Sequence, residues 1–186
     1  FWLTAIMAAR FLSSAFASGP ALLILLCLIV RKVSTFDPGK EQIRTLGGIV
    51  TYAFILNMFF LLLEVFTAFY SQIPGHMHSF IYLFSGLEGH DSVLAPWMWA
   101  SVAFAIVALA LLIVPATRRR EDILAVGCAA VIASTWIDKG FGLVICGFIP
   151  NPFERVFEYW PTAPEVLISV GVWATGFFIL SVLYKI

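Results

Sequence analysis

Long apolar stretches alternate with short polar connections along this chain. Five stretches are long enough to cross about 30 Å of hydrocarbon, which takes roughly 20 mostly apolar residues in a helix. They lie at about residues 1–30, 45–71, 96–114, 122–149 and 164–184. Each run is too long for a strand, and the period-two alternation of a membrane β-barrel is absent. The pattern predicts an all-α integral membrane protein, a five-transmembrane-helix bundle forming a single domain over residues 1–186.

Local signals mark where some of these helices begin. Pro96 suits the first turn of the third span, where a missing N–H costs little. Thr162-Ala-Pro-Glu165 has the spacing of a capping box and is expected to open the fifth span. The two longest connections, residues 72–95 and 150–163, are predicted as loops on the same side of the membrane.

The basic residues predict the orientation of the chain. If the spans alternate in direction, eight basic residues fall on one side of the membrane: Arg31, Lys32, Lys40, Arg44, Arg118, Arg119, Arg120 and Lys185. The loops on the other side carry only Arg155. The positive-inside rule then places the basic side and the C-terminus in the cytoplasm. We expect a multi-pass protein of a bacterial or archaeal cytoplasmic membrane, with residues 72–95 and 150–163 facing outward.

Composition narrows the possible functions. The chain is 61% hydrophobic and 12% charged, with a formal net charge of zero, so bulk charge does not indicate nucleic-acid binding. Three cysteines cannot supply a four-cysteine iron–sulfur or zinc site. No predicted span contains a histidine, which argues against a haem held between helices. No metal site and no soluble-enzyme motif is expected.

Four ionisable residues interrupt the predicted spans: Arg10, Glu64, Asp138 and Lys139. Each costs roughly 2.5–3.5 kcal/mol near the bilayer centre on insertion scales, so it needs a partner or water. At about 1.5 Å per residue, all four lie roughly 10–17 Å below the outer surface. Two charges are positive and two are negative. The sequence therefore predicts one polar cluster in the outer half of the bundle.

Two uncharged side chains are expected to belong to the same region. Asn57 lies seven residues before Glu64 and shares its face of the helix, and Ser134 lies four residues before Asp138. Together with the four charged residues they are candidates for a proton path or a quinone site, because intramembrane carboxylates commonly relay protons. The alternative is that the charges pair only to fix helix packing.

The loop 72–95 carries further polar residues that can contact a partner at the outer face. The candidates are His76, His78, His90 and Asp91. Their irregular spacing is a weak signal for a metal, and solvated or partner-contacting side chains are the simpler interpretation.

Several segments, in this order, resemble a known family. They are Asn57–Tyr70 (NMFFLLLEVFTAFY), Gly86–His90 (GLEGH), Trp136–Leu143 (WIDKGFGL), Gly147–Pro152 (GFIPNP) and Tyr159–Glu165 (YWPTAPE). Together they resemble the second half of the polysulfide-reductase and nitrite-reductase membrane subunits, the NrfD/PsrC-like family. The likeness is greatest to the DsrP and HmeB type subunits of sulfate-reducer respiratory complexes. It covers nearly the whole chain.

The resemblance implies an integral membrane subunit of a respiratory oxidoreductase complex, active in anaerobic respiration and sulfur metabolism. Family members generally have eight to ten spans, so five correspond to about half. Such subunits exchange electrons between a membrane quinone, such as menaquinone, and a ferredoxin-like iron–sulfur subunit on the outer face. Multihaem cytochrome c and other membrane subunits can join the complex. Iron–sulfur clusters and haem are thus expected only in partner subunits, and proton translocation through the second bundle is a further expectation.

Two alternatives remain open at the level of sequence. The chain could be half of a secondary transporter or ion channel, with the first span broken near Gly19-Pro20. It could also be a structural anchor in which the four charges only pair.

Overall fold

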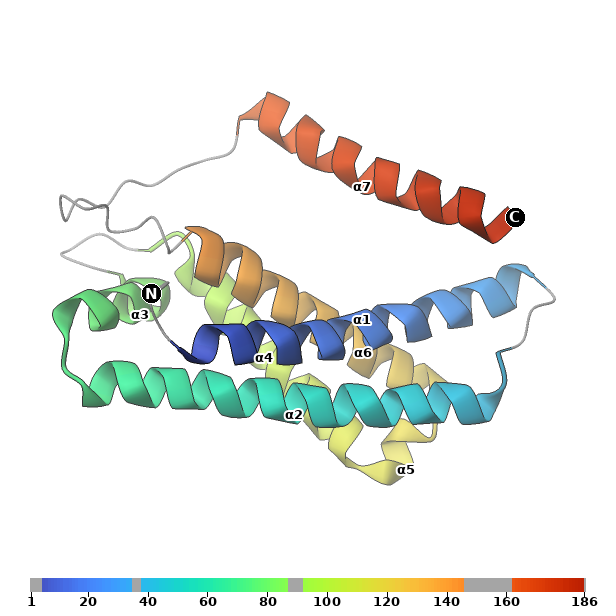
Figure 1. The fold of residues 1–186 in the computed structure, drawn as a ribbon, viewed down its shortest axis with the longest axis horizontal. Coiled ribbons are helices and arrows are strands. Elements are labelled where there is room, and N and C mark those ends of the chain that lie inside the picture. Colours follow the sequence, from blue (N-terminus) through green and yellow to red (C-terminus); the bar gives the residue numbers. More distant parts are fainter. Residues whose placement is uncertain (1–4, 35–37, 87–91, 146–161, 186) are drawn as a thin grey trace. The chain divides into compact units, whose positions relative to one another are not determined.

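The computed structural model of the chain describes residues 5–34, 38–86, 92–145 and 162–185 (Figure 1). The chain divides into two compact units, residues 1–156 and 157–186, and each is described by itself. The single domain expected from the sequence stays a prediction. Within the described ranges, all the regular structure is helical and no strand occurs.

Among the described residues, the first unit contains seven helical elements and the second contains one. In chain order they are α1 (Ile6–Val33), α2 (Lys40–Tyr70), α3 (Pro74–Ser85), α4 (Ala95–Ile113), α5 (Pro115–Arg118), α6 (Glu121–Ile137), the π-helix η1 (Asp138–Ile145) and α7 (Ala163–Lys185).

Five helical segments of the described chain are long and apolar enough to cross a membrane, which confirms the number of predicted spans. They are α1, α2, α4, the continuous run of α6 and η1 over Glu121–Val144, and α7. Many large apolar side chains of the first unit also point outward, among them Leu12, Phe16, Leu62 and Phe66. Such an apolar exterior suits hydrocarbon rather than water. The chain is a multi-pass membrane protein.

The structure adds detail to one predicted span and corrects one predicted loop. The fourth span, predicted over 122–149, is α-helical to Ile137 and continues as a π-helix. Residues 146–149 lie outside the described part. The segment 72–95 was expected as a loop, but it contains α3, a 12-residue helix with Pro74 in its first turn. The fixed φ of a proline in the first turn favours the start of a helix. The pattern of apolar positions alone does not indicate this start.

The four long segments of the first unit pack around one core. Helix α1 lies along α2 and against α6, and α4 packs on α6 (Figure 1). Small residues, among them Ala17, Ala21, Ala105 and Ala108, lie in the buried contact. Small side chains let membrane helices approach closely, so van der Waals packing can hold them together without a hydrophobic driving force.

Close helix contacts require glycine at two positions. A Cβ on Gly127 of α6 would stand 3.1 Å from Leu112 Cδ2 on α4. A Cβ on Gly47 of α2 would stand 3.2 Å from Leu124 Cδ1 on α6. Both contacts are tighter than ordinary van der Waals distances, so with a larger residue the facing leucine has to shift within the packed core.

The second unit shows the glutamate half of the predicted capping box. The backbone N–H of Thr162 donates a hydrogen bond to Glu165 Oε2 at 2.7 Å, and the Thr162 hydroxyl approaches the same oxygen at 2.7 Å. The glutamate thus satisfies a donor that the first turn leaves unpaired. Helix α7 begins one residue after this threonine, as the sequence predicted.

Candidate functional site

Arg10 bridges two carboxylates that come from different elements of the first unit. Its Nη1 forms an ion pair with Oε2 of Glu64 on α2. Its Nη2 donates a hydrogen bond to Oδ1 of Asp138, at the start of η1, over 2.5 Å. The exposed fractions of Arg10, Glu64 and Asp138 are only 3%, 4% and 8%. The bridge therefore ties α1 to α2 and to η1 in the apolar interior.

The change from α-helix to π-helix positions Asp138 and its neighbour. The backbone N–H of Asp138 still bonds to the carbonyls of Ser134 and Thr135, as the end of α6 requires, and the π-helix η1 begins at this same residue. A π segment inserts a residue relative to the α repeat and often occurs at functional sites. Two consecutive charged residues, Asp138 and Lys139, follow this point and both reach the interior side of the bundle.

Lys139 completes the cluster on the opposite side of Asp138. Its Nζ lies 3.5 Å from Asp138 Oδ2, close enough for an ion pair. The geometry does not meet the criteria for a hydrogen bond, and both atoms are buried without a hydrogen-bond partner in the described chain. The ammonium also lies 4.8 Å from the ring centroid of Phe11, a cation–π arrangement.

The cluster is electrically balanced. Two positive and two negative side chains lie together, as their depths along the helices predicted. Removing one member of a buried pair typically costs about 3–5 kcal/mol, because the remaining charge is left uncompensated. The four side chains therefore depend on one another, because the loss of any one leaves the charge of its partner unbalanced.

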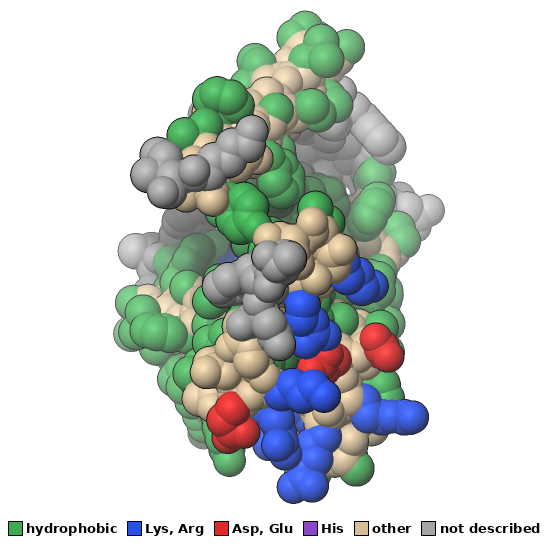
Figure 2. Space-filling model, turned by 90° about the vertical axis from the view of Figure 1, so that its right-hand side faces the viewer, with side chains coloured by type: hydrophobic (Ala, Val, Ile, Leu, Met, Phe, Trp, Pro, Cys, Tyr) green, Lys and Arg blue, Asp and Glu red, His purple; other side chains and the backbone are tan. Residues whose placement is uncertain are grey.

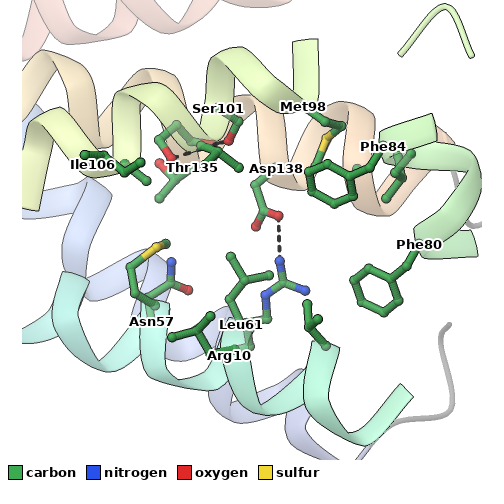
Figure 3. Close-up of a pocket in the computed structure, with 18 of the residues that line it drawn as sticks. Arg10, Asn57, Leu61, Phe80, Phe84, Met98, Ser101, Ile106, Thr135 and Asp138 are labelled. Atoms are coloured by element: carbon green, nitrogen blue, oxygen red, sulfur yellow. Dashed lines mark hydrogen bonds and ion pairs between the residues drawn. The ribbon is translucent and has the colours of Figure 1, made fainter. Parts of the chain in front are cut away.

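A cavity of about 320 Å³ lies beside the cluster, between α1, α2, α3, α4, α6 and η1. This volume is at the lower end of the ~300–1,000 Å³ found for small-molecule sites. Figure 3 shows the guanidinium of Arg10 and the carboxylate of Asp138 at its middle, with Phe80 and Phe84 on one side and Asn57 on the other. Most of the remaining wall is aliphatic, so the cavity is an apolar chamber with a few polar groups.

The polar groups of this wall have spare hydrogen-bonding capacity. Asn57 is 1% exposed, and neither its amide nitrogen nor its amide oxygen has a hydrogen-bond partner in the described chain. Arg10 Nε is also buried and has no hydrogen-bond partner in the described chain. Across the cavity, the Ser101 hydroxyl donates to the Ser134 carbonyl at 2.9 Å. Buried donors and acceptors usually find partners, so these groups are suited to hold a polar ligand group.

A second, more open cavity of about 390 Å³ lies on the other side of the α1–α6 contact. Lys139, Phe11 and Trp136 contribute to its wall, whereas Arg10 and Asp138 line the first cavity. Thr135 lines both. The Asp138–Lys139 pair thus lies between two cavities, with one carboxylate oxygen toward Arg10 and the other toward Lys139.

Comparison with known proteins adds an independent observation. A sequence model of the family described as "Polysulphide reductase, NrfD" matches residues 1–150, most of the chain. This chain belongs to the NrfD polysulphide reductase family. The matched range includes every member of the charge cluster.

One curated relative of this NrfD-family chain comes from Halobacterium salinarum and is described as a membrane subunit of dimethyl sulfoxide reductase. The two are 23% identical over 202 residues. The alignment covers 96% of this chain but only 44% of the relative. The chain therefore spans less than half the length of the curated relative that it matches.

The outer-face candidates of this NrfD-family chain lie partly in α3 and partly outside the described residues. His76 and His78 both belong to α3, and His78 is half-buried. His90 and Asp91 lie outside the described residues. A contact with a partner subunit through these four residues stays a prediction.

Sequence reasoning missed several residues of the site. Ser101 is the only polar residue within the apolar run of α4 downstream of Trp99, and this isolation could have singled it out. Thr135 follows Ser134 directly and was overlooked beside it. Phe11 carries no chemical signal of its own, because only the fold places its ring under Lys139.

Proposed function

We propose that this chain forms part of the membrane subunit of a respiratory oxidoreductase complex and that the 320 Å³ cavity receives the headgroup of a membrane quinone. The observation that carries the proposal is the buried bridge of Arg10 to Glu64 and Asp138 at the wall of an apolar cavity. Family membership supports a membrane subunit, and the Halobacterium salinarum relative is described as one.

A quinone headgroup matches the chemistry of the cavity wall. It is a flat apolar ring with a carbonyl oxygen at each end, so it needs apolar walls and hydrogen-bond donors. The unpaired Nε of Arg10 and the amide nitrogen of Asn57 are both donors with no other use in the described chain. The aromatic side chains Phe80 and Phe84 form an apolar part of the same wall.

Reduction of a quinone to a quinol takes two electrons and two protons. The electrons would come from an iron–sulfur partner subunit, since no redox cofactor is expected within this chain. Asp138 lines the cavity, and Glu64 contacts it through Arg10, so these two carboxyl groups are the candidates for passing protons; Lys139 connects Asp138 to the second cavity. The same residues would release the protons if the reaction runs in the direction of quinol oxidation.

The electron donor or acceptor is proposed to bind at the end of the bundle that carries α3. The opposite end is rich in Lys and Arg, so the positive-inside rule assigns it to the cytoplasm, together with the C-terminus. A ferredoxin-like iron–sulfur subunit would then lie on the outer face, and multihaem cytochrome c or further membrane subunits can join it. His76 and His78 on α3 are candidate contacts.

The proposal is tested by purifying the protein from native membranes in a mild detergent and measuring co-eluting subunits, bound iron and bound quinone. We expect a ferredoxin-like subunit, iron and a quinone in stable proportion. A protein that elutes without quinone and without an iron–sulfur partner would contradict the proposal and favour a transporter.

The structure gives little support to that alternative. The transporter hypothesis placed a broken helix at Gly19-Pro20, but α1 is continuous from Ile6 to Val33 with Pro20 inside it. The irregular backbone occurs instead at η1, beside the charge cluster. The structural-anchor hypothesis predicts a different result. If the four charges only pair, mutations in the cluster would affect assembly and leave the turnover of the assembled complex unchanged.

A further inference from the structure

The end of the first unit opposite α3 carries a surplus of positive charge. In the described chain, the basic residues at this end are Arg31, Lys32, Lys40, Arg44, Arg118, Arg119 and Arg120. The acidic residues there are Glu41, Glu121 and Asp122. Figure 2 shows Lys and Arg side chains gathered over the lower part of this face, with few acidic side chains between them. We call this region the basic end.

The ion pairs within the described chain leave much of this charge uncompensated. Arg31 pairs with Glu121, and Arg44 lies 3.9 Å from an exposed carboxylate oxygen of Glu41. Arg118 has no carboxylate within ion-pair distance among the described residues. The basic end therefore has a net attraction for anions, concentrated where α5 meets α2.

The guanidinium of Arg118 lies against α2, at the level of Thr51. Its Nη1 donates a long hydrogen bond to Thr51 Oγ1 of α2, at 3.4 Å. Its Cγ lies 3.7 Å from the position of a Cβ on Gly47, so the aliphatic stem runs across the glycine surface of α2. The side chain is half-buried, and most of its guanidinium donors remain available.

The depth of Thr51 defines where this guanidinium lies in the bilayer. Helix α2 has 31 residues, and at about 1.5 Å per residue it is longer than the ~30 Å of hydrocarbon. If its last residue, Tyr70, marks the outer boundary, the opposite boundary falls near Thr51, roughly 28 Å away along the axis. The charge of Arg118 thus lies at the level where lipid phosphates meet the acyl chains.

We propose that Arg118 and Arg44 hold the phosphate of an anionic phospholipid from the leaflet at the basic end, while the buried Thr51, whose hydroxyl donates to the Gly47 carbonyl, orients the guanidinium of Arg118. Arg44 lies seven residues before Thr51 and so occupies the same face of α2. Guanidinium groups bind phosphate oxygens in a bidentate manner, which suits two arginines around one headgroup.

An acyl chain has a path below this headgroup site. Ile55 lies one turn beyond Thr51 on the same face of α2, and Leu62 two turns further; their exposed fractions are 40% and 69%. An acyl chain lying along them would continue from the phosphate toward the bilayer centre. A free phosphate would gain nothing from this surface, so the site favours a lipid.

The test uses the intact membrane protein in nanodiscs of phosphatidylcholine containing a minor fraction of phosphatidylglycerol. Native mass spectrometry measures how much phosphatidylglycerol stays bound. We expect Arg118→Gln to weaken retention about fivefold, which corresponds to ~1 kcal/mol for one basic side chain near the membrane surface. Lys32→Gln is the matched control, because it removes the same charge from the exposed end of α1 and should leave retention unchanged.

Further variants keep the test decisive. Arg118→Lys retains the charge but loses the bidentate fork, so retention should lie between those of the parent and Arg118→Gln. If Arg118→Gln does not fold, Arg44→Gln tests the same site from an exposed position and should also weaken retention.

Three results would overturn the proposal. Equal losses in Arg118→Gln and Lys32→Gln would indicate a diffuse surface potential without a site. Displacement of phosphatidylglycerol by inorganic phosphate at equal concentration would indicate a free-anion site. Loss of a soluble subunit with unchanged lipid retention would indicate a protein-docking surface.

Discussion

Arg10 and Asp138 are 128 residues apart in the chain, yet Nη2 and Oδ1 lie 2.5 Å apart in the buried interior. The same guanidinium also pairs with Glu64, so one arginine compensates two carboxylates on two other elements. Lys139 supplies the second positive charge beyond Asp138. The cluster therefore acts as a unit, and its members are expected to respond to mutation in a non-additive way.

Replacing the shared arginine should be the most damaging single change in the cluster. Arg10→Met leaves two buried carboxylates without their partner, so we expect a loss of about 3–5 kcal/mol in the free energy of unfolding. Equilibrium unfolding in detergent, followed by circular dichroism, measures this loss.

The matched control is Arg31→Met. Arg31 pairs with Glu121 at the basic end, where the two side chains are 31% and 27% exposed. This ion pair should contribute ~1 kcal/mol or less. Similar losses in the free energy of unfolding for the two variants would show that burial does not strengthen the Arg10 bridge. Adding Glu64→Gln to Arg10→Met should recover much of the stability, because Asp138 then keeps Lys139 as its partner.

Glu64→Gln separates proton transfer from assembly. The glutamine keeps the size of the side chain but cannot take up or release a proton next to Arg10, so quinone turnover should fall on the order of 10²-fold. The complex should still assemble, because Arg10 keeps its hydrogen bond to Asp138. Steady-state quinone assays on the reconstituted complex measure turnover, with Glu121→Gln as the control. Normal turnover in Glu64→Gln would argue against a role in proton transfer.

Asn57→Leu should affect binding and stability in opposite directions. The substitution removes two buried polar atoms that have no partner in the described chain, which should leave stability unchanged or raise it by about 1–3 kcal/mol. The KM for quinone should rise, because a donor at the cavity wall is lost. Thermal unfolding and steady-state kinetics provide the two measurements. Lower stability with an unchanged KM would mean that the amide serves the fold.

Two glycine variants test the close contact between α4 and α6. Gly127→Ala places a Cβ 3.1 Å from Leu112 Cδ2, so this buried leucine must shift by a few tenths of an ångström, and overpacking of this kind costs about 1–3 kcal/mol. Gly48→Ala on α2 meets nothing within 4 Å and should stabilise by roughly 0.5–1 kcal/mol through helix propensity. Equal effects of both variants on thermal unfolding would show that the Gly127 contact is not tight.

The depth of each charged residue could be read from the chain because a helix has a fixed rise per residue. Counting from the ends of the spans placed Arg10, Glu64, Asp138 and Lys139 at one level. The counting could not say which partner each residue takes, since that depends on helix rotation and on which helices are neighbours. The single arginine shared by Glu64 and Asp138 emerges only from the packed structure.

The fourth span shows most clearly what the pattern of apolar residues does not reveal. Its apolar composition predicted a membrane helix, but hydrophobicity is nearly the same for an α-helical and a π-helical turn, so the widening after Ile137 left no trace in the pattern. The cavity beside Asn57 was equally hidden, because a void is a property of several side chains from separate elements.

The sequence by itself determined the membrane class, the number of spans and the level of the buried charges. Each follows from local physics: the thickness of hydrocarbon, the rise of a helix and the cost of a charge away from water. Only the tertiary structure decided that Arg10 serves two carboxylates, that Asp138 and Lys139 lie between two cavities and that Asn57 faces one of them. These relationships depend on side-chain packing between distant segments, and a one-dimensional pattern of polar and apolar residues does not encode the helix rotations that produce them.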